Sequence, residues 1–223
     1  MIKLEQISFS YGKTPVLQDF SFSFEPGRFY GIFGKNGCGK STLMKLITGE
    51  LPPSDGTVLP RFRSPLERAQ MLAFMEQQYP ERIPLTVQET VELGTYPWRR
   101  KSNAFSVEEI LNQLDLLELR HRCYSTLSGG EKQRVMLARI LAQQTPILLL
   151  DEPFSSFDYG NQHHFYRILK EIARQGKCVV MVTHDVFVSR EYLDTALLLK
   201  DGVLFQSGSP GDCLTEKNLK EIY

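Results

Sequence analysis

The chain has 223 residues and a hydrophobic content of 42 %, which suits one globular domain with lobes or two small domains. Its 26 basic residues balance 26 acidic ones, so the net charge is zero and argues against a nucleic acid as the partner. The 4 cysteines lie far apart, without metal-ligand spacing, and predict reduced thiols in the cytoplasm. The N-terminal residues lack the pattern of a signal peptide, and no run reaches the about 18 apolar residues of a membrane span. We therefore expect any membrane role to depend on a partner.

The start of the chain alternates apolar and polar residues. Ile2–Phe9 and Val16–Phe24 keep this period of two on either side of a turn at Tyr11–Lys13, which predicts antiparallel strands with one solvated face. Short apolar runs then alternate with helical patterns, as is typical of an α/β domain with a mainly parallel sheet. The expected strands are Phe29–Phe33, Leu72–Met75, Ile147–Leu150, Cys178–Val182 and Ala196–Leu199, and the expected helices are Ser41–Thr48, Val107–Leu119, Glu131–Gln143 and Gln162–Gln175.

The region from Pro80 to about Thr126 is charged and helix-rich and contains no apolar run that would form a strand. Ser106 and Glu109 have capping-box spacing just before an apolar periodicity. We interpret about residues 80–140 as a helical subdomain inserted into a core of residues 1–79 and 141–223, which includes the β-subdomain. The chain is then a single domain.

Glycine-rich sequence follows the first expected parallel strand. Gly34-Lys35-Asn36-Gly37-Cys38-Gly39-Lys40-Ser41 has the spacing of a P-loop and leads through Thr42 into an expected helix. Its glycines let backbone N–H groups surround phosphate oxygens, Lys40 can reach the β- and γ-phosphates, and Ser41 can hold Mg²⁺. The helix N-terminus adds unpaired N–H groups and a partial positive charge. The pattern predicts a site for a nucleoside triphosphate with Mg²⁺.

An acidic pair ends one of the expected buried strands. Asp151 follows Ile147–Leu150, at the carboxyl end of a strand where ligands of open α/β sheets bind. We expect Asp151 to support Mg²⁺ and Glu152 to orient or activate an attacking water, because phosphoryl transfer depends on positioning and charge stabilisation. In isolation, the same pair could cap a strand at a solvated loop.

The segment Leu127-Ser128-Gly129-Gly130-Glu131 resembles the signature sequence of ATP-binding-cassette (ABC) ATPases. With the P-loop and Asp151-Glu152, it makes nearly the whole chain similar to that family, with the motifs in the family's order. The resemblance implies a P-loop NTPase fold, ATP and Mg²⁺ as ligands, and ATP hydrolysis as the activity. It also implies that Ser128, Gly129 and Gly130 complete the nucleotide site of a second subunit, in a head-to-tail homodimer around two ATP molecules.

Further positions match motifs of the ABC family. Tyr11 corresponds to the aromatic residue that stacks on adenine, although it could also be a turn tyrosine that packs on the core. Gln77 corresponds to the glutamine that contacts Mg²⁺ and senses the transmembrane partner, with Gln78 as a possible alternative register. His184 corresponds to the histidine that contacts the γ-phosphate; alone, it would be read as a core histidine. Asp158 corresponds to the D-loop, where the family more often has Ala-Leu in place of Ser156-Phe157.

The resemblance thus assigns roles to three overlapping sets of residues. The catalytic set is Lys40, Gln77, Glu152 and His184; the metal set is Ser41, Gln77 and Asp151; and the ATP-binding set is Tyr11, Gly34, Lys35, Asn36, Gly37, Cys38, Gly39, Lys40, Ser41, Thr42, Ser128, Gly129, Gly130 and Asp158.

The segment Gly94-Thr95-Tyr96-Pro97-Trp98 resembles a stretch in the ATPases of bacterial importers for iron-siderophore complexes, haem and cobalamin. The resemblance implies integral-membrane permease subunits and a solute-binding protein as partners, on the cytoplasmic face of the cell membrane. The Pro-Trp pair could instead anchor its loop by burying the indole. Two alternatives stay open: an exporter ATPase, and a soluble ABC protein for scaffolding, repair or translation.

Overall fold

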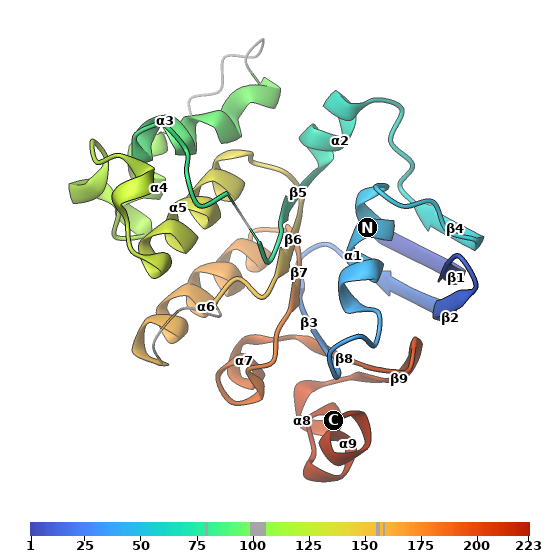
Figure 1. Ribbon diagram of the computed structural model, residues 1–223. Coiled ribbons are helices and arrows are strands. Elements are labelled where there is room, and N and C mark those ends of the chain that lie inside the picture. The colour runs from blue at the N-terminus through green and yellow to red at the C-terminus, as the bar shows by residue number, and fades with distance from the viewer. Residues whose placement is uncertain (79, 99–105, 155–156, 158) are drawn as a thin grey trace.

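Two β-sheets lie on either side of one helix in the computed structural model, which describes residues 1–78, 80–98, 106–154, 157 and 159–223 (Figure 1). The smaller sheet is antiparallel and has the order β2-β1-β4. Its strands are β1 (Ile2–Tyr11), β2 (Thr14–Phe24) and β4 (Asp55–Leu59). The predicted N-terminal β-subdomain is confirmed, with β4 as an additional strand that the sequence did not predict.

The larger sheet has six strands in the order β5-β6-β7-β3-β8-β9. Neighbours from β5 to β8 are parallel, and only the edge strand β9 runs antiparallel to β8. The bounds are β3 (Phe29–Phe33), β5 (Leu72–Met75), β6 (Ile147–Asp151), β7 (Cys178–Val182), β8 (Thr195–Lys200) and β9 (Val203–Gly208). The inner strands are mainly apolar because both faces of a parallel sheet are covered, and their polar residues, such as Asp151 of β6 and Thr195 and Lys200 of β8, lie at strand ends. The chain therefore has the α/β architecture of a P-loop NTPase.

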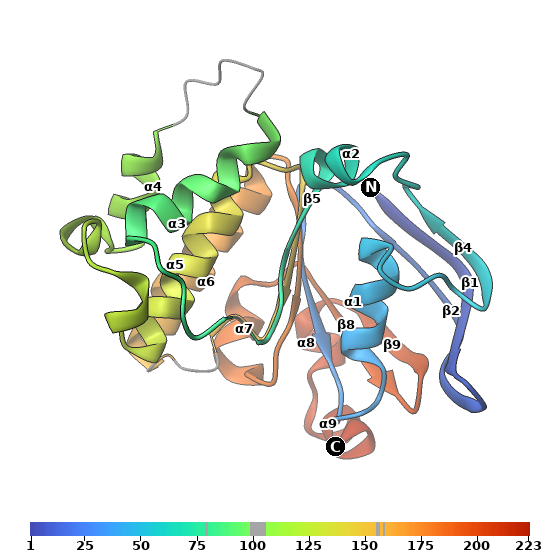
Figure 2. The same ribbon diagram turned by 45° about the horizontal axis from the view of Figure 1, so that its top comes forward.

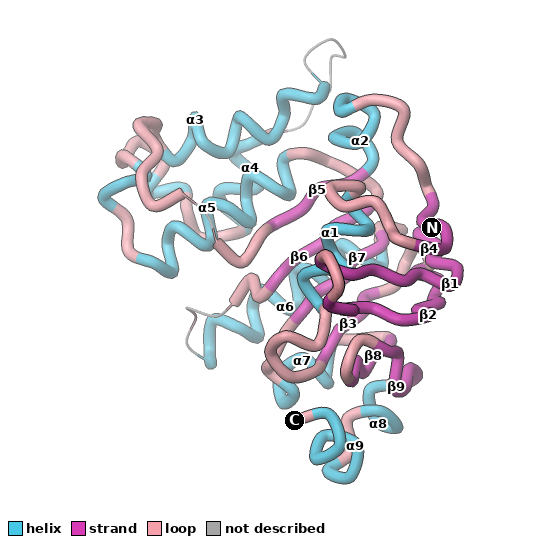
Figure 3. Tube along the Cα trace, turned by 45° about the vertical axis from the view of Figure 1, so that its right-hand side comes forward, coloured by secondary structure: helices cyan, strands magenta, loops and turns pink. Residues whose placement is uncertain are grey.

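Alternate residues of the inner strands enter two separate cores. Phe29 and Phe33 of β3 pack with α5 (Gly129–Ala142) and α6 (Tyr159–Arg174) on one face of the large sheet. Tyr30 and Ile32 pack on the other face with α1 (Lys40–Thr48) and the small sheet. Figures 2 and 3 show α1 between the two sheets, with the helices α3 to α6 gathered on the opposite side. The P-loop at the start of α1 thus lies at the carboxyl edge of the large sheet.

The region between β5 and β6 is helical, as predicted, but one expected helix is interrupted. It contains α3 (Val87–Glu92), η1 (Leu93–Trp98), α4 (Val107–Gln113), η2 (Leu117–Leu119) and η3 (Tyr124–Thr126) ahead of α5. The single helix expected over Val107–Leu119 is wrong, because Asp115 has a φ of 54° and turns the chain after α4. The N–H of Leu116 then bonds to the carbonyl oxygen of Leu111 at 2.7 Å, which closes the turn.

Short helices complete the fold. They are α2 (Pro65–Met71), α7 (Val186–Tyr192), α8 (Pro210–Cys213) and α9 (Glu216–Ile222). The sequence analysis missed them because each has at most 7 residues, about two helical turns, which is too few to show a clear period. None of the described helices has the length and apolar character needed to cross a bilayer.

Candidate nucleotide-binding site

The P-loop connects the end of β3 to the first turn of α1. Gly34, Gly37 and Gly39 have φ angles of 152°, 82° and 106°, which other L-residues adopt at a cost. Two of these glycines are also required by packing. A Cβ atom on Gly34 would lie 2.4 Å from the carbonyl oxygen of Leu199, and one on Gly39 would lie 2.9 Å from the side chain of Leu17. The neighbouring strands therefore hold the loop closely.

Lys40, the lysine of the P-loop, is buried against the backbone of the same loop. Lys40 is 6 % exposed, and its Nζ donates hydrogen bonds to the carbonyl oxygens of Gly34 at 2.6 Å and Lys35 at 3.0 Å. A buried ammonium group needs such acceptors, and phosphate oxygens could replace them. Lys35 itself faces outward and pairs with Asp201 at 2.8 Å, a contact that raises the pKa of Lys35 and lowers the pKa of Asp201.

Asp151 and Ser41 form a small oxygen-rich group beside the loop. Asp151 ends β6 and is 5 % exposed, and burial raises its pKa even though the Ser41 hydroxyl donates a hydrogen bond to it. Carboxylate and hydroxyl oxygens are the protein ligands that suit Mg²⁺. The pair lies next to Lys40, so a metal held there would be close to bound phosphates.

Glu152 is held between Gln77 and His184. Its Oε2 accepts a hydrogen bond from Nε2 of Gln77 at 2.9 Å, and its Oε1 lies 2.8 Å from Nε2 of His184. The three residues follow β5, β6 and β7, which are neighbours in the sheet, so strand order alone brings them to one edge. The backbone of Glu152 has a φ of 50°, a strained conformation of the kind that clusters at functional sites.

Most of these groups line one cleft of about 520 Å³ at the carboxyl edge of the large sheet, whereas the predicted site residues Gly34, Lys35, Cys38 and Asp151 do not line it. Tyr11 stands at its rim, half exposed, with its ring edge-on to Phe9 at a centroid distance of 4.9 Å. The lining residues are Tyr11, Val16, Asn36, Gly37, Gly39, Lys40, Ser41, Thr42, Gln77, Glu152 and His184. Of the two neighbouring glutamines, the structure places Gln77 in the cleft.

Other predicted site residues lie away from this cleft. Ser128 caps α5, where its hydroxyl accepts from the N–H of Glu131 and the Glu131 carboxylate accepts from the N–H of Ser128. These bonds to Ser128 lower the pKa of Glu131. Ser128, Gly129 and Gly130 do not line the cleft of their own chain. The predicted D-loop positions Ser155, Ser156 and Asp158 lie outside the described residues.

Sequence reasoning missed two residues that support Glu152 and the P-loop. Gln133 of α5 is 2 % exposed, and its Nε2 donates to the carbonyl oxygen of Glu152 at 3.3 Å. Tyr223 lies beside Gly34 and the ring of His184. Both contacts join segments that are far apart in the sequence, so no local pattern could have indicated them.

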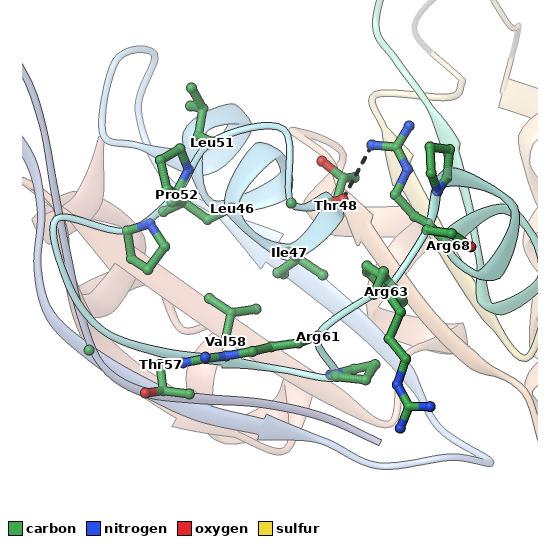
Figure 4. A pocket seen from close by; sticks show the side chains of 17 residues that line it. Leu46, Ile47, Thr48, Leu51, Pro52, Thr57, Val58, Arg61, Arg63 and Arg68 are labelled. Atoms are coloured by element: carbon green, nitrogen blue, oxygen red, sulfur yellow. Dashed lines mark hydrogen bonds between the residues drawn. The ribbon is translucent and has the colours of Figure 1, made fainter.

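A second hollow, of about 560 Å³, lies between the C-terminal end of α1, β4 and α2 (Figure 4). Leu46, Ile47 and Val58 supply apolar walls, and Arg61, Arg63 and Arg68 stand around them. The three guanidinium groups point in different directions, and Arg68 donates to the carbonyl oxygen of Thr48 at 3.4 Å. They do not converge as a phosphate site requires, so the cleft at the P-loop is the candidate nucleotide site.

The chain belongs to the ABC transporter family, whose sequence model matches residues 17–155. It is 37 % identical to the hemin import ATP-binding protein HmuV of Thermobifida fusca, over 97 % of this chain and 80 % of the relative. It is 35 % identical to the high-affinity zinc uptake system ATP-binding protein ZnuC of Bacillus subtilis, over 100 % of this chain and 99 % of the relative. Among solved structures, the ABC cassette MJ0796 in a dimeric post-hydrolysis state with ADP and Pi superposes with a TM-score of 0.81 at 30 % identity, over 94 % of this chain and 99 % of that one.

Proposed function

We propose that this chain is the ATP-hydrolysing subunit that powers an ABC importer. The observation that carries the proposal is the position of Glu152, whose carboxylate is held by Gln77 and His184 in the same cleft as the P-loop. A carboxylate fixed at that place can orient or activate the water that attacks the γ-phosphate. The P-loop of the same cleft can hold the phosphates in line with that water.

The remaining groups in and beside the cleft have separate roles in binding Mg-ATP. Lys40 exchanges its two carbonyl acceptors for β- and γ-phosphate oxygens, while the N–H groups from Gly34 to Thr42 surround the phosphates. Ser41, Asp151 and Gln77 hold or support Mg²⁺, which supplies charge neutralisation to the phosphates. Tyr11, exposed at the rim, stacks on the adenine ring.

A second copy of the chain completes each nucleotide site. Ser128 caps α5, a helix of 14 residues that begins at Gly129, and both Ser128 and Gly129 are exposed. Neither they nor Gly130 line the cleft of their own subunit. A helix N-terminus binds anions, so this end suits the γ-phosphate of a partner's ATP. The dimeric state of the MJ0796 relative supports the same arrangement. Asp158 belongs to this proposal as a contact near the dimer interface.

The permease contacts an apolar face formed by α2 and η1. Leu66 and Met71 of α2 are 52 % and 37 % exposed, and Leu93 and Tyr96 of η1 are 44 % and 56 % exposed. The two elements lie side by side, since Nε2 of Gln70 donates to the carbonyl oxygen of Pro97 at 2.9 Å. Large apolar side chains that gather on a surface mark interaction sites.

This permease face is held firmly to the core. The indole N–H of Trp98 donates to the carbonyl oxygen of Gln143 at 2.7 Å, and Nε2 of Gln143 donates to the carbonyl oxygens of Ala69 and Leu72. Trp98 therefore anchors its loop, while Leu93 and Tyr96 face outward. A movement of the permease face would reach β5 and, beyond it, Gln77 in the cleft.

The cargo is a metal chelate, with uptake through the membrane permease and delivery by a solute-binding protein. The Thermobifida relative is named as a hemin import ATP-binding protein, which supports this class, and the name of the zinc uptake relative makes metal ions the alternative cargo. The chain then works on the cytoplasmic face of the membrane through its permease. Its zero net charge speaks against nucleic acid as a partner.

The test compares Glu152→Gln with Glu171→Gln, an exposed glutamate on α6. In the complex with its permease, E152Q should bind MgATP normally and hydrolyse it roughly a hundredfold or more slowly, because it lacks the group that activates water. E171Q should match the wild type in both assays. Normal phosphate release by E152Q would reject the role of Glu152. If the wild type and both variants all fail to release phosphate, the proposed hydrolase activity is rejected.

A further inference from the structure

Tyr223, which follows α9, reaches both the P-loop and the segment that follows β7. Its ring centroid lies 6.3 Å from that of His184, at an interplanar angle of 52°, within the range of about 4.5–7 Å where aromatic rings attract. Tyr223 is 54 % exposed, but partial burial raises the pKa of its hydroxyl, and a hydrogen bond with the backbone of Gly34 offsets part of this shift. One side chain thus lies between the first glycine of the P-loop and the histidine after β7.

The helix that carries Tyr223 is fixed to the same edge of the sheet. Ile222 is 2 % exposed, and Nζ of Lys200 pairs with Oε2 of Glu221 at 2.8 Å. Lys200 follows Leu199, whose carbonyl oxygen faces Gly34 so closely that no Cβ fits between them. Figure 2 shows α9 directly beside the turn from β3 into α1. The end of β8, α9 and the P-loop therefore form one packed unit, which gives Tyr223 a defined position.

His184 depends on its neighbours for the orientation of its ring. Nε2 contacts Oε1 of Glu152 at 2.8 Å, whereas Nδ1 has no hydrogen bond to any residue in the described part of the chain. A single contact at Nε2 leaves the ring free to rotate about it, so packing must decide the angle of the imidazole. The ring of Tyr223 supplies that packing.

We propose that Tyr223 is a positioning residue for His184, which holds the imidazole toward Glu152 and the γ-phosphate and links α9 to the P-loop. The expected effect on turnover rests on the proposed ATPase function, whereas the contact between Tyr223 and His184 does not depend on it. Misplacing a catalytic group by about 1 Å can cost roughly a hundredfold in rate, so a packing residue of this kind affects turnover without touching ATP.

A neighbouring aromatic side chain offers a matched control. Tyr223 also forms one wall of an apolar hollow of about 690 Å³, together with Val186, Phe187, Leu214 and Leu219. Phe187 is 85 % exposed and has no aromatic partner in the described part of the chain. Phe187→Ala therefore opens the same hollow as Tyr223→Ala but leaves the contact with His184 in place.

The first test needs no hydrolysis. The chain has 4 histidines, so its imidazole NMR signals give few peaks, and the signals of His184 are those absent from H184A. Tyr223→Ala should shift the His184 signals, because the ring current of Tyr223 is lost. Tyr223→Phe and F187A should leave them nearly unchanged. Unshifted His184 signals in Y223A would overturn the inference, whatever the protein's activity.

The second test uses the assembled complex with its permease. Tyr223→Ala should lower kcat by roughly tenfold, with KM for ATP changed by less than about threefold, and Y223F should recover kcat within about twofold. In a background of His184→Ala, Y223A should cause no further loss, because contacting residues are non-additive. Equal losses in F187A, or additive losses with H184A, would overturn the positioning role. An inactive wild type would instead overturn the proposed function and leave the NMR result standing.

Discussion

At the nucleotide cleft, the important groups are polar and are fixed by backbone geometry, as with Lys40 over its loop carbonyls and Glu152 between Gln77 and His184. On the face of α2 and η1, the groups are apolar and exposed, as with Leu66 and Tyr96. Few arrangements of side chains and backbone can bind and hydrolyse a phosphate, whereas an apolar surface can bind many different partners. The proposed activity therefore rests on the cleft alone, and the proposed permease face indicates only the kind of partner.

Gly34→Ala should break the cleft and leave the permease face intact. Its φ of 152° and the Leu199 oxygen 2.4 Å from a Cβ leave no room for a side chain. Backbone strain and overpacking each cost about 1–3 kcal/mol. The loop would relax out of its phosphate-binding shape, so we expect MgATP affinity to fall roughly a hundredfold. Titration of nucleotide into the purified chain measures this loss, and Gly211→Ala, at an unstrained and open position, is the control.

Gly94→Ala should break the permease face and spare the cleft. A Cβ on Gly94 would lie 2.1 Å from the carbonyl oxygen of Arg139 and 3.0 Å from Cβ of Ala142, so η1 would move off α5. Overpacking of this kind destabilises by about 1–3 kcal/mol, which thermal melting detects. Binding of MgATP to the isolated chain should stay normal, while permease-stimulated hydrolysis falls. A variant that melts like the wild type would show that the close contact is not structural.

Leu93→Ser tests the permease face without disturbing the fold. The side chain is 44 % exposed, so its loss should leave the melting temperature unchanged but weaken association with the permease by roughly tenfold. Val203→Ser on β9, at 42 % exposure, is the matched control. Affinity for the permease in detergent or nanodiscs gives the comparison. Equal effects of the two substitutions would remove the special role of the α2 and η1 face.

The smallest expected effect is on the thermal stability of the protein without bound metal. Burial raises the pKa of Asp151 above the 3.8 of an ordinary aspartate, so the folded chain binds its proton more tightly than the unfolded chain. The stabilising effect of this proton is therefore present at low pH and is lost as the pH rises through the folded pKa. Asp151→Asn should melt slightly above the wild type at about pH 7, and the difference should disappear toward about pH 4. A less stable D151N at neutral pH would contradict this account.

The sequence predicted the parts of the molecule that depend on local pattern. The P-loop between Phe33 and Thr42 was recognisable because its glycines, lysine and serine must occupy fixed positions. The buried strands were recognisable because apolar residues cover both faces of the parallel sheet. Gln77 and His184 were indicated only by the resemblance to the ABC family, and the order of the three strands that precede them and Glu152 explains why the three side chains meet.

The remaining features depend on contacts between distant segments. Tyr223 reaches Gly34 because an ion pair between Lys200 and Glu221 holds α9 against β8. Gln143 connects Trp98 to α2 through hydrogen bonds that form only when the helices pack together. The break at Asp115 was missed because the apolar period continues across it, although the backbone turns there. Neither the subdomain limits near residues 80 and 140 nor the role of Asp158 is decided by such patterns, and both stay predictions.

The most direct test of the central claim is to identify what the ATP-bound subunit holds in the membrane. A tagged Glu152→Gln variant would be purified with MgATP from detergent-solubilised native membranes, and the proteins that co-purify would be identified. Our account predicts a polytopic permease in equal amount with the subunit, bound through α2 and η1 and therefore lost in the additional L93S variant. Recovery of soluble proteins or nucleic acid alone, with ATP binding intact, would contradict the importer and favour a soluble ABC ATPase.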